Sequence, residues 1–270
     1  MNLASLIASW PASVAGVAVV TQGGVVDRAG DLAAPLPWAS VTKIATALAT
    51  WIAVEEGTVR FDEPVGPPGA TLRHLLAHAS GLAFDGTAPI APPGTRRIYS
   101  NRGFEILADH VASRAGMPFE QYLREAVFEP LGMTATRLEG SPAAGCAGPV
   151  DDLALLAAEL LAPTLVSSAT VSLATAVAFP GLDGVLPGFG RQAPNDWGLG
   201  VEVRGHKSPH WTPPSASPRT FGHFGRAGGF LWVDPDRALA CVCLTDEPFG
   251  PWAASAWPEL GEAVLTAGSG

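Results

Sequence analysis

Segments typical of β-strands lie at both ends of this 270-residue chain, and segments typical of helices lie between them. Residues 14–30 (VAGVAVVTQGGVVDRAG) contain two β-rich runs around QGG, which predicts a hairpin near the N-terminus. From about residue 197, four more runs have strand character: WGLGVEVRG, RTFGHFG, GGFLWVDP and ALACVCLTD. This order predicts one antiparallel sheet built from both termini, with a helical insert beside it.

We therefore expect an α+β fold, an α/β sandwich whose antiparallel sheet is flanked by helices and joined to a mostly helical inserted subdomain. Residues 1–270 would form a single domain, with the α/β part at about 1–60 and 195–270 and the helical part at about 61–194. Helical spacing, an early Ser and a closing Gly predict a helix within residues 40–57. The last segment, 252–267, predicts a helix that is kinked or started near Pro258. Four more helical segments occupy the middle of the chain: 71–82, 101–116, 119–132 and 150–163.

The composition is that of a compact globular protein, with 47% hydrophobic and 15% charged residues. The net charge is −9 and the chain has no block of five or six basic residues, so nucleic-acid binding has no support. The first 20 residues lack the positive start of a secretory signal, and no run is apolar enough to span a bilayer, so we expect a cytoplasmic protein. Its three cysteines give no disulfide framework and are interpreted as reduced structural residues.

A lysine stands out at position 43, because the chain has fourteen arginines and only two lysines. Arginine cannot release its proton in a protein, whereas a buried lysine can. Ser40 lies three residues earlier, so both side chains share one face of the predicted helix. A desolvated lysine can activate such a serine as a nucleophile, although Ser-x-x-Lys alone is a weak signal.

Two further short motifs follow in the sequence. IYSNRG contains Tyr99 and Asn101 between a Pro/Gly/Arg loop and a predicted helix, where a scaffold can display polar groups. TFGHFGRAGG contains His223 on a predicted strand, and its glycines permit close approach of a backbone or a ligand. Taken singly, each motif is more typical of helix capping or of an ordinary strand histidine.

Together and in this order, the three motifs resemble those of the serine β-lactamase and D-alanyl-D-alanine peptidase superfamily. The resemblance is strongest to the branch of class C β-lactamases, DD-carboxypeptidases, esterases and D-aminopeptidases, with motifs Ser-x-x-Lys, Tyr-x-Asn and Lys-Thr-Gly or His-x-Gly. LRHLLAHASGL, FEPLGMTATRL and WVDPDRALACVCLTD look like further segments of that family. The similarity extends from about residue 14 to the C-terminal helix.

The resemblance implies that Ser40 accepts the acyl group, while Lys43 and Tyr99 handle protons. Which of these two is the general base stays open at this point, since their titrations are coupled. Asn101 would contact the lysine and the substrate, and His223 would face Tyr99. The reaction implied needs no metal or cofactor.

The family pattern also implies an oxyanion hole formed by the backbone N–H groups of Ser40 and Arg226. Gly225 would line the substrate site. Phe224 stands where a threonine is common, and we expect it to add apolar surface in place of a carboxylate-binding hydroxyl. Trp38, next to the nucleophile, is a further candidate for substrate binding.

These observations predict a serine hydrolase that acts on a small ester or amide, with an esterase first. D-Ala-D-Ala carboxypeptidase, D-aminopeptidase and β-lactamase activities are alternatives, and a penicillin-binding-type receptor with little turnover is the non-enzyme alternative. The oligomeric state is left open. His74 and His78 have an i, i+4 metal-ligand spacing without a His-Glu-x-x-His motif, so we expect no metal site. The loop 205–220 is either a surface connection or the rim of a site.

Overall fold

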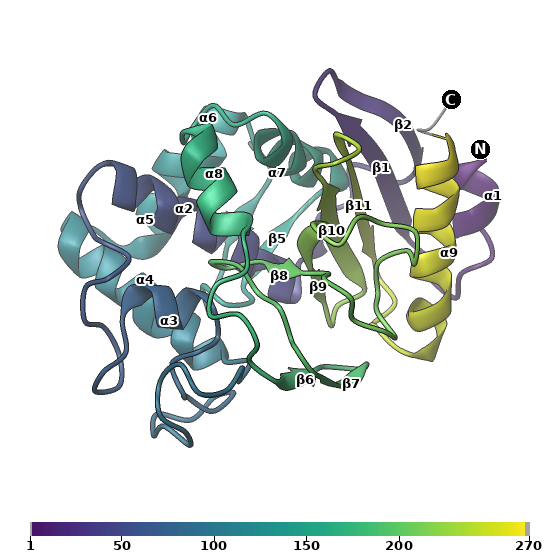
Figure 1. The fold of residues 1–270 in the computed structure, drawn as a ribbon. Coiled ribbons are helices and arrows are strands. Elements are labelled where there is room, and N and C mark those ends of the chain that lie inside the picture. Colours follow the sequence, from purple (N-terminus) through teal and green to yellow (C-terminus); the bar gives the residue numbers. More distant parts are fainter. Residues whose placement is uncertain (1, 268–270) are drawn as a thin grey trace.

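The computed structural model describes residues 2–267, so residue 1 and residues 268–270 of the expected single domain lie outside the described part. Its centre is a six-stranded antiparallel sheet in the order β2-β1-β11-β10-β9-β8 (Figure 1). The N-terminal strand β1 pairs along its whole length with the C-terminal strand β11, which confirms a sheet built from both ends of the chain. The strands of this sheet are β1 (Ala15–Thr21), β2 (Gly24–Gly30), β8 (Glu202–Val203), β9 (Phe221–Gly225), β10 (Gly229–Asp234) and β11 (Leu239–Thr245).

Helices cover both faces of the sheet and form the separate helical part (Figure 1). They are α1 (Leu3–Ile7), α2 (Thr42–Glu55), α3 (Leu72–Leu76), α4 (Asn101–Ala115), α5 (Phe119–Leu123), α6 (Glu129–Leu131), α7 (Val150–Leu161), α8 (Ser168–Thr175) and α9 (Pro251–Ala267), with the short 3-10 helix η1 (Ala39–Val41) and the short π-helix η2 (Arg124–Phe128).

The alternation of side chains along the central strands creates two cores. In β11, Ala240, Val242 and Leu244 belong to the large core that contains α2 and α7, while Cys241 and Cys243 face the second core with α1 and α9. Neighbouring residues of a strand point to opposite faces, so an uninterrupted apolar strand can serve two helical layers. All three cysteines are buried and free.

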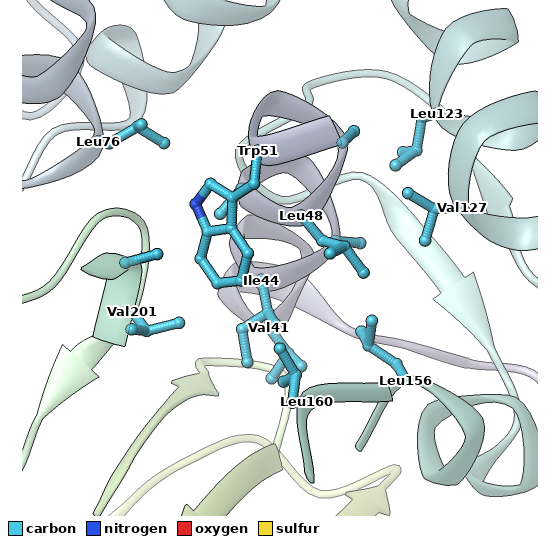
Figure 2. Close-up of a cluster of buried hydrophobic side chains, with 14 of the residues drawn as sticks. Val41, Ile44, Leu48, Trp51, Leu76, Leu123, Val127, Leu156, Leu160 and Val201 are labelled. Carbon is cyan, nitrogen blue, oxygen red and sulfur yellow. The ribbon is translucent and has the colours of Figure 1, made fainter. Parts of the chain in front are cut away.

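Helix α2 lies at the centre of the large core. Twelve of its fourteen residues are buried, as expected of a helix that is apolar on all sides. Figure 2 shows Ile44, Leu48 and Trp51 of this helix surrounded by side chains from other elements. Gly200 lies so near that a Cβ atom there would come within 2.2 Å of the Ala47 Cβ. This dense packing fixes the start of α2, where the motif Ser-x-x-Lys is found.

Several local expectations need correction. Helix α9 begins at Pro251 and contains Pro258, so a start near Pro258 is wrong. A proline is tolerated in the first turn, because the N–H that it lacks would have no partner there. Of the run WGLGVEVRG only Glu202–Val203 forms a strand, β8. Helix α8 and the small strands were not foreseen: β3 (Leu36–Pro37), β4 (Arg137–Leu138), β5 (Cys146–Gly148), β6 (Gly184–Leu186) and β7 (Gly190–Gln192).

Helix α7 falls in the sequence range expected for the helical part, yet it packs on β1, β10 and β11 of the large sheet. The division of the domain at residues 61 and 194 stays a prediction.

No helix among residues 2–267 combines the length and apolar character required to cross a bilayer.

Candidate active site

Ser40 lies in the turn η1, immediately before α2, and its side chain is partly exposed. Strand β9 runs closely past this turn. A Cβ atom at Gly225 would lie only 2.3 Å from the Trp38 carbonyl oxygen and 3.3 Å from the Ser40 nitrogen. Glycine is therefore required where the end of β9 meets the serine, which is the close approach expected from the sequence.

The Lys43 amine is fully buried one helical turn from Ser40 and has three oxygen neighbours. Its Nζ lies 2.7 Å from Asn101 Oδ1, 2.8 Å from the Ala143 carbonyl oxygen and 3.4 Å from Ser40 Oγ. The Asn101 amide is oriented in turn by its Nδ2, which donates to Asp85 Oδ1 at 3.5 Å. The two short hydrogen bonds use two N–H groups of the lysine amine, and the longest of its three contacts is the one to Ser40 Oγ.

Burial lowers the pKa of Lys43 to about 7, against smaller opposing effects of the nearby Asp85 and Glu105 carboxylates. A large fraction of this amine is thus neutral at physiological pH. In its neutral form the amine can donate to Asn101 and Ala143 and still offer its lone pair to Ser40. Lys43 is therefore equipped to accept the serine proton.

Tyr99 and His223 form a second pair beside the serine. The Tyr99 hydroxyl lies 3.2 Å from His223 Nε2, and His223 Nδ1 lies 2.6 Å from the Phe224 carbonyl oxygen. A carbonyl only accepts, so Nδ1 carries the hydrogen and Nε2 accepts from the tyrosine hydroxyl.

The pKa values of this pair are displaced so that both groups are neutral at pH 7. Burial raises the pKa of Tyr99, helped by Glu202 and opposed by a hydrogen bond with Ser40. Burial, together with Lys43, lowers the pKa of His223 to about 3. Tyr99 therefore retains its proton at neutral pH, which suits it to donate rather than to accept.

The local sequence explains how Tyr99 and Asn101 are displayed. Ser100 caps α4, because its Oγ accepts the Gly103 N–H at 3.1 Å, and Asn101 is the first helical residue. Tyr99 and Asn101, the two neighbours of Ser100, thus lie at the start of one helix and are directed toward Ser40 and Lys43. The structure brings together all five residues that were expected to be catalytic: Ser40, Lys43, Tyr99, Asn101 and His223.

Two expected substrate contacts are corrected by the structure. Trp38 is fully buried and its indole N–H donates to the Gly148 carbonyl oxygen at 3.2 Å, so its side chain belongs to the core. The Phe224 ring packs in the second core, 4.9 Å from the Phe249 ring and 5.9 Å from that of Trp257. Adjacent residues of β9 point to opposite faces, so His223 faces the site and Phe224 faces α9.

Arg226 follows Gly225 directly, and its side chain is exposed. Its backbone N–H stays a predicted partner of the Ser40 N–H in an oxyanion hole. No sequence pattern points to the Ala143 carbonyl, since any residue carries such a group.

A cavity of about 780 Å³ opens beside Tyr99, between the loop that follows α3 and the hairpin of β6 and β7. Its walls include Phe84, Ile90 and Val185, which are large apolar side chains exposed to solvent. Sequence reasoning did not identify these residues, because they lie in loops and short strands without periodic pattern.

The remaining candidate histidines and the second lysine make contacts within the fold. His74 Nδ1 lies 2.8 Å from the Thr71 hydroxyl at the start of α3, and His78 packs against Tyr99. The second lysine, Lys207, forms a buried ion pair with Glu202, with 2.7 Å between Nζ and Oε1. Among residues 2–267, no three His, Cys, Asp or Glu residues are grouped so that they could hold a metal ion.

Comparison with known proteins agrees with this geometry. The sequence model of the Beta-lactamase family matches residues 11–265. A solved β-lactamase from Mycobacterium bovis is 52% identical, with a TM-score of 0.97 over 99% of both chains. The D-alanyl-D-alanine-carboxypeptidase/endopeptidase AmpH of Escherichia coli K12 is 30% identical over 141 residues. This match covers 38% of the chain and only 37% of that curated relative. Simvastatin synthase from Aspergillus terreus, 16% identical with a TM-score of 0.83 over 98% of this chain and 96% of its own, shares the fold.

Proposed function

The chain belongs to the β-lactamase family of serine hydrolases, and we propose that Ser40 forms an acyl-enzyme with a small ester or amide. The observation that carries this proposal is the Lys43 amine, with two short bonds to acceptors and its third direction toward Ser40. A purely structural lysine would gain nothing from a fully buried position beside a partly exposed serine.

In the acylation step, Lys43 takes the proton of Ser40 while Oγ forms a bond to the substrate carbonyl carbon. The N–H groups of Ser40 and Arg226 stabilise the negative charge on the carbonyl oxygen. As the bond to the leaving group breaks, its oxygen or nitrogen takes the proton of Tyr99, and the lysine ammonium returns a proton to the tyrosine. Water then attacks the acyl-enzyme with the same groups in reverse, which releases the acid and restores Ser40.

The assignment of Lys43 as base and Tyr99 as donor rests on the opposite shifts of their pKa values: that of Lys43 is lowered and that of Tyr99 is raised. Burial favours the neutral form of each group, and the neutral forms are an amine that accepts and a phenol that donates. His223 accepts the hydrogen bond of Tyr99 and so orients the phenol.

An ester is the substrate class that the site supports best, because the cavity beside Tyr99 exposes the apolar side chains of Phe84, Ile90 and Val185. The relatives named as a carboxypeptidase and as a β-lactamase make peptides and β-lactams the alternatives. A receptor that is acylated with little turnover is the non-enzyme alternative.

Turnover of p-nitrophenyl acetate and butyrate, a chromogenic cephalosporin and a D-Ala-D-Ala peptide distinguishes these functions. We expect ester turnover that Ser40→Ala abolishes, with much slower cephalosporin turnover. Faster cephalosporin or peptide hydrolysis would assign the alternatives instead. A stable adduct on Ser40 in mass spectrometry, without turnover of any compound, would identify a receptor.

A further inference from the structure

We propose that the cavity beside Tyr99 binds a bulky apolar alcohol portion of the ester that carries no positive charge, an inference that rests on the proposed hydrolase function. Its position next to the proton donor assigns it to the leaving group. Its size and lining define the chemistry of that group.

The apolar character of the cavity comes from side chains that would otherwise be unfavourably exposed. Phe84, Ile90 and Val185 are 50%, 64% and 60% exposed, and they are three of the eight large apolar residues exposed among residues 2–267. They come from distant parts of the chain, which are joined where Arg97 pairs with Gly184. Such clustering of exposed apolar side chains is typical of a binding surface.

The leaving group must lie on the Tyr99 side of the reacting carbonyl. Tyr99 lines the cavity, and its hydroxyl is the group that retains a proton at neutral pH. A donor acts on an atom within hydrogen-bond reach, so the alcohol oxygen lies at Tyr99 and the rest of the alcohol extends into the cavity. A volume of about 780 Å³ exceeds what an ethyl group can fill.

The charges around the cavity disfavour a cationic alcohol. Three arginines line it, Arg96, Arg97 and Arg191, whereas Asp183 is the one acidic residue among its walls. The guanidinium of Arg97 is buried and donates to backbone carbonyl oxygens. Asp183 is paired with Arg191 at 2.7 Å. The remaining positive charge repels an ammonium group but not an alkyl chain.

The test is a series of acetate esters with alcohols of increasing size: ethyl, butyl, hexyl and 3,3-dimethylbutyl acetate, with acetylcholine as the charged counterpart of the last. All of them form the same acetyl-enzyme, so differences in kcat/KM report the alcohol alone. We expect kcat/KM to rise about fourfold per methylene group. We expect 3,3-dimethylbutyl acetate to be preferred over acetylcholine by at least about tenfold.

A double variant, Ile90→Ala with Val185→Ala, should lower the hexyl-to-ethyl ratio of kcat/KM about tenfold. Leu173→Ala is the matched control, since Leu173 is 47% exposed on α8 and should leave the ratio unchanged. Ser40-dependent turnover with no dependence on alcohol size would overturn this inference alone. Absence of Ser40-dependent turnover of every ester would overturn the hydrolase proposal, and this inference with it.

A different set of contacts assigns a positioning role to His78, and we infer that it holds Tyr99 in place for proton donation. Its carbonyl oxygen accepts the Ile98 N–H at 2.8 Å, and its Nδ1 accepts the Ser100 N–H at 3.1 Å. These bonds fix both chain neighbours of the tyrosine. The imidazole also packs on the Tyr99 ring, with 4.5 Å between ring centroids.

The backbone of His78 has an uncommon conformation. Its φ is +52°, in the left-handed region that only a few per cent of non-glycine residues adopt, with Asn, Asp and His the most frequent among them. Because Nδ1 accepts, the hydrogen is on Nε2, and this buried atom has no hydrogen-bond partner among the described residues. The ring is thus kept for its Nδ1 bond and its packing.

His78→Phe keeps a ring but removes the acceptor, whereas His78→Asn keeps an acceptor and suits the backbone conformation. Ethanol needs a proton as it leaves, but p-nitrophenolate does not. We therefore expect His78→Phe to reduce kcat/KM for ethyl acetate at least about tenfold more than for p-nitrophenyl acetate, like Tyr99→Phe. His78→Asn should restore most of this difference. An equal loss with both esters in His78→Phe would show a general structural role and overturn the inference.

Discussion

Replacement of Lys43 by methionine should make the stability of the protein respond differently to pH. In the unfolded chain the lysine has a pKa of 10.5, whereas burial lowers it to about 7 in the folded protein. The unfolded state therefore binds more protons between these values, and the folded wild type becomes more stable as pH rises. The whole shift corresponds to about 5 kcal/mol, of which about 2 kcal/mol is regained between pH 7 and pH 9.

The measurement is urea unfolding of wild type and Lys43→Met at pH 7, 8 and 9 at constant salt. The methionine does not titrate, so its free energy of unfolding serves as the baseline in which other ionisable groups cancel. We expect wild type to gain about 2 kcal/mol relative to the variant over this range. Lost contacts with Asn101 shift the difference by a constant and leave its slope unaffected. A difference that is flat from pH 7 to pH 9 would refute the lowered pKa and with it the neutral lysine base.

The remaining predictions concern activity and packing. The rate of acylation should fall below about pH 7 as Lys43 gains its proton, which a kcat/KM profile from pH 5 to 9 measures. Asn101→Asp places a carboxylate beside the amine and raises the pKa of Lys43, so the acid limb should move to higher pH; an unmoved limb would assign it to another group. Gly225→Ala places a Cβ atom 2.3 Å from the Trp38 carbonyl oxygen and should destabilise the protein by about 2 kcal/mol or more, seen as a lower Tm. Gly23→Ala, with 3.7 Å to the nearest atom, is its control and should leave the Tm almost unchanged.

The order of segments predicted the architecture because each part of it has a local signal. The alternating and apolar runs at both ends became β1, β9, β10 and β11, and the helical spacing after Ser40 became α2. Short elements such as β6 and β7 have three residues each, too few for a period to be recognised. Helix α9 begins at Pro251 and not near Pro258, and Trp257 and Leu260 on either side of this proline pack in the second core.

In the candidate site too, only some of the residues could be predicted from the sequence. Ser40, Lys43, Tyr99 and His223 could be identified because their types and order form a recognisable set. The sequence does not show to which face of the sheet a strand residue points. Phe224 was therefore expected in the pocket, whereas its ring lies in the second core. The apolar wall is supplied by Phe84, which no motif marks.

By itself the sequence determined which chemical groups are available and in which order they occur: a serine, a scarce lysine, a tyrosine and a histidine, with sheet-forming ends around a helical middle. Only the tertiary structure decided what these groups can do. The pKa of Lys43 depends on its removal from water and, to a smaller extent, on the carboxylates of Asp85 and Glu105, which lie far from it along the chain. Desolvation and long-range contacts have no local pattern, because they arise only when distant segments pack together.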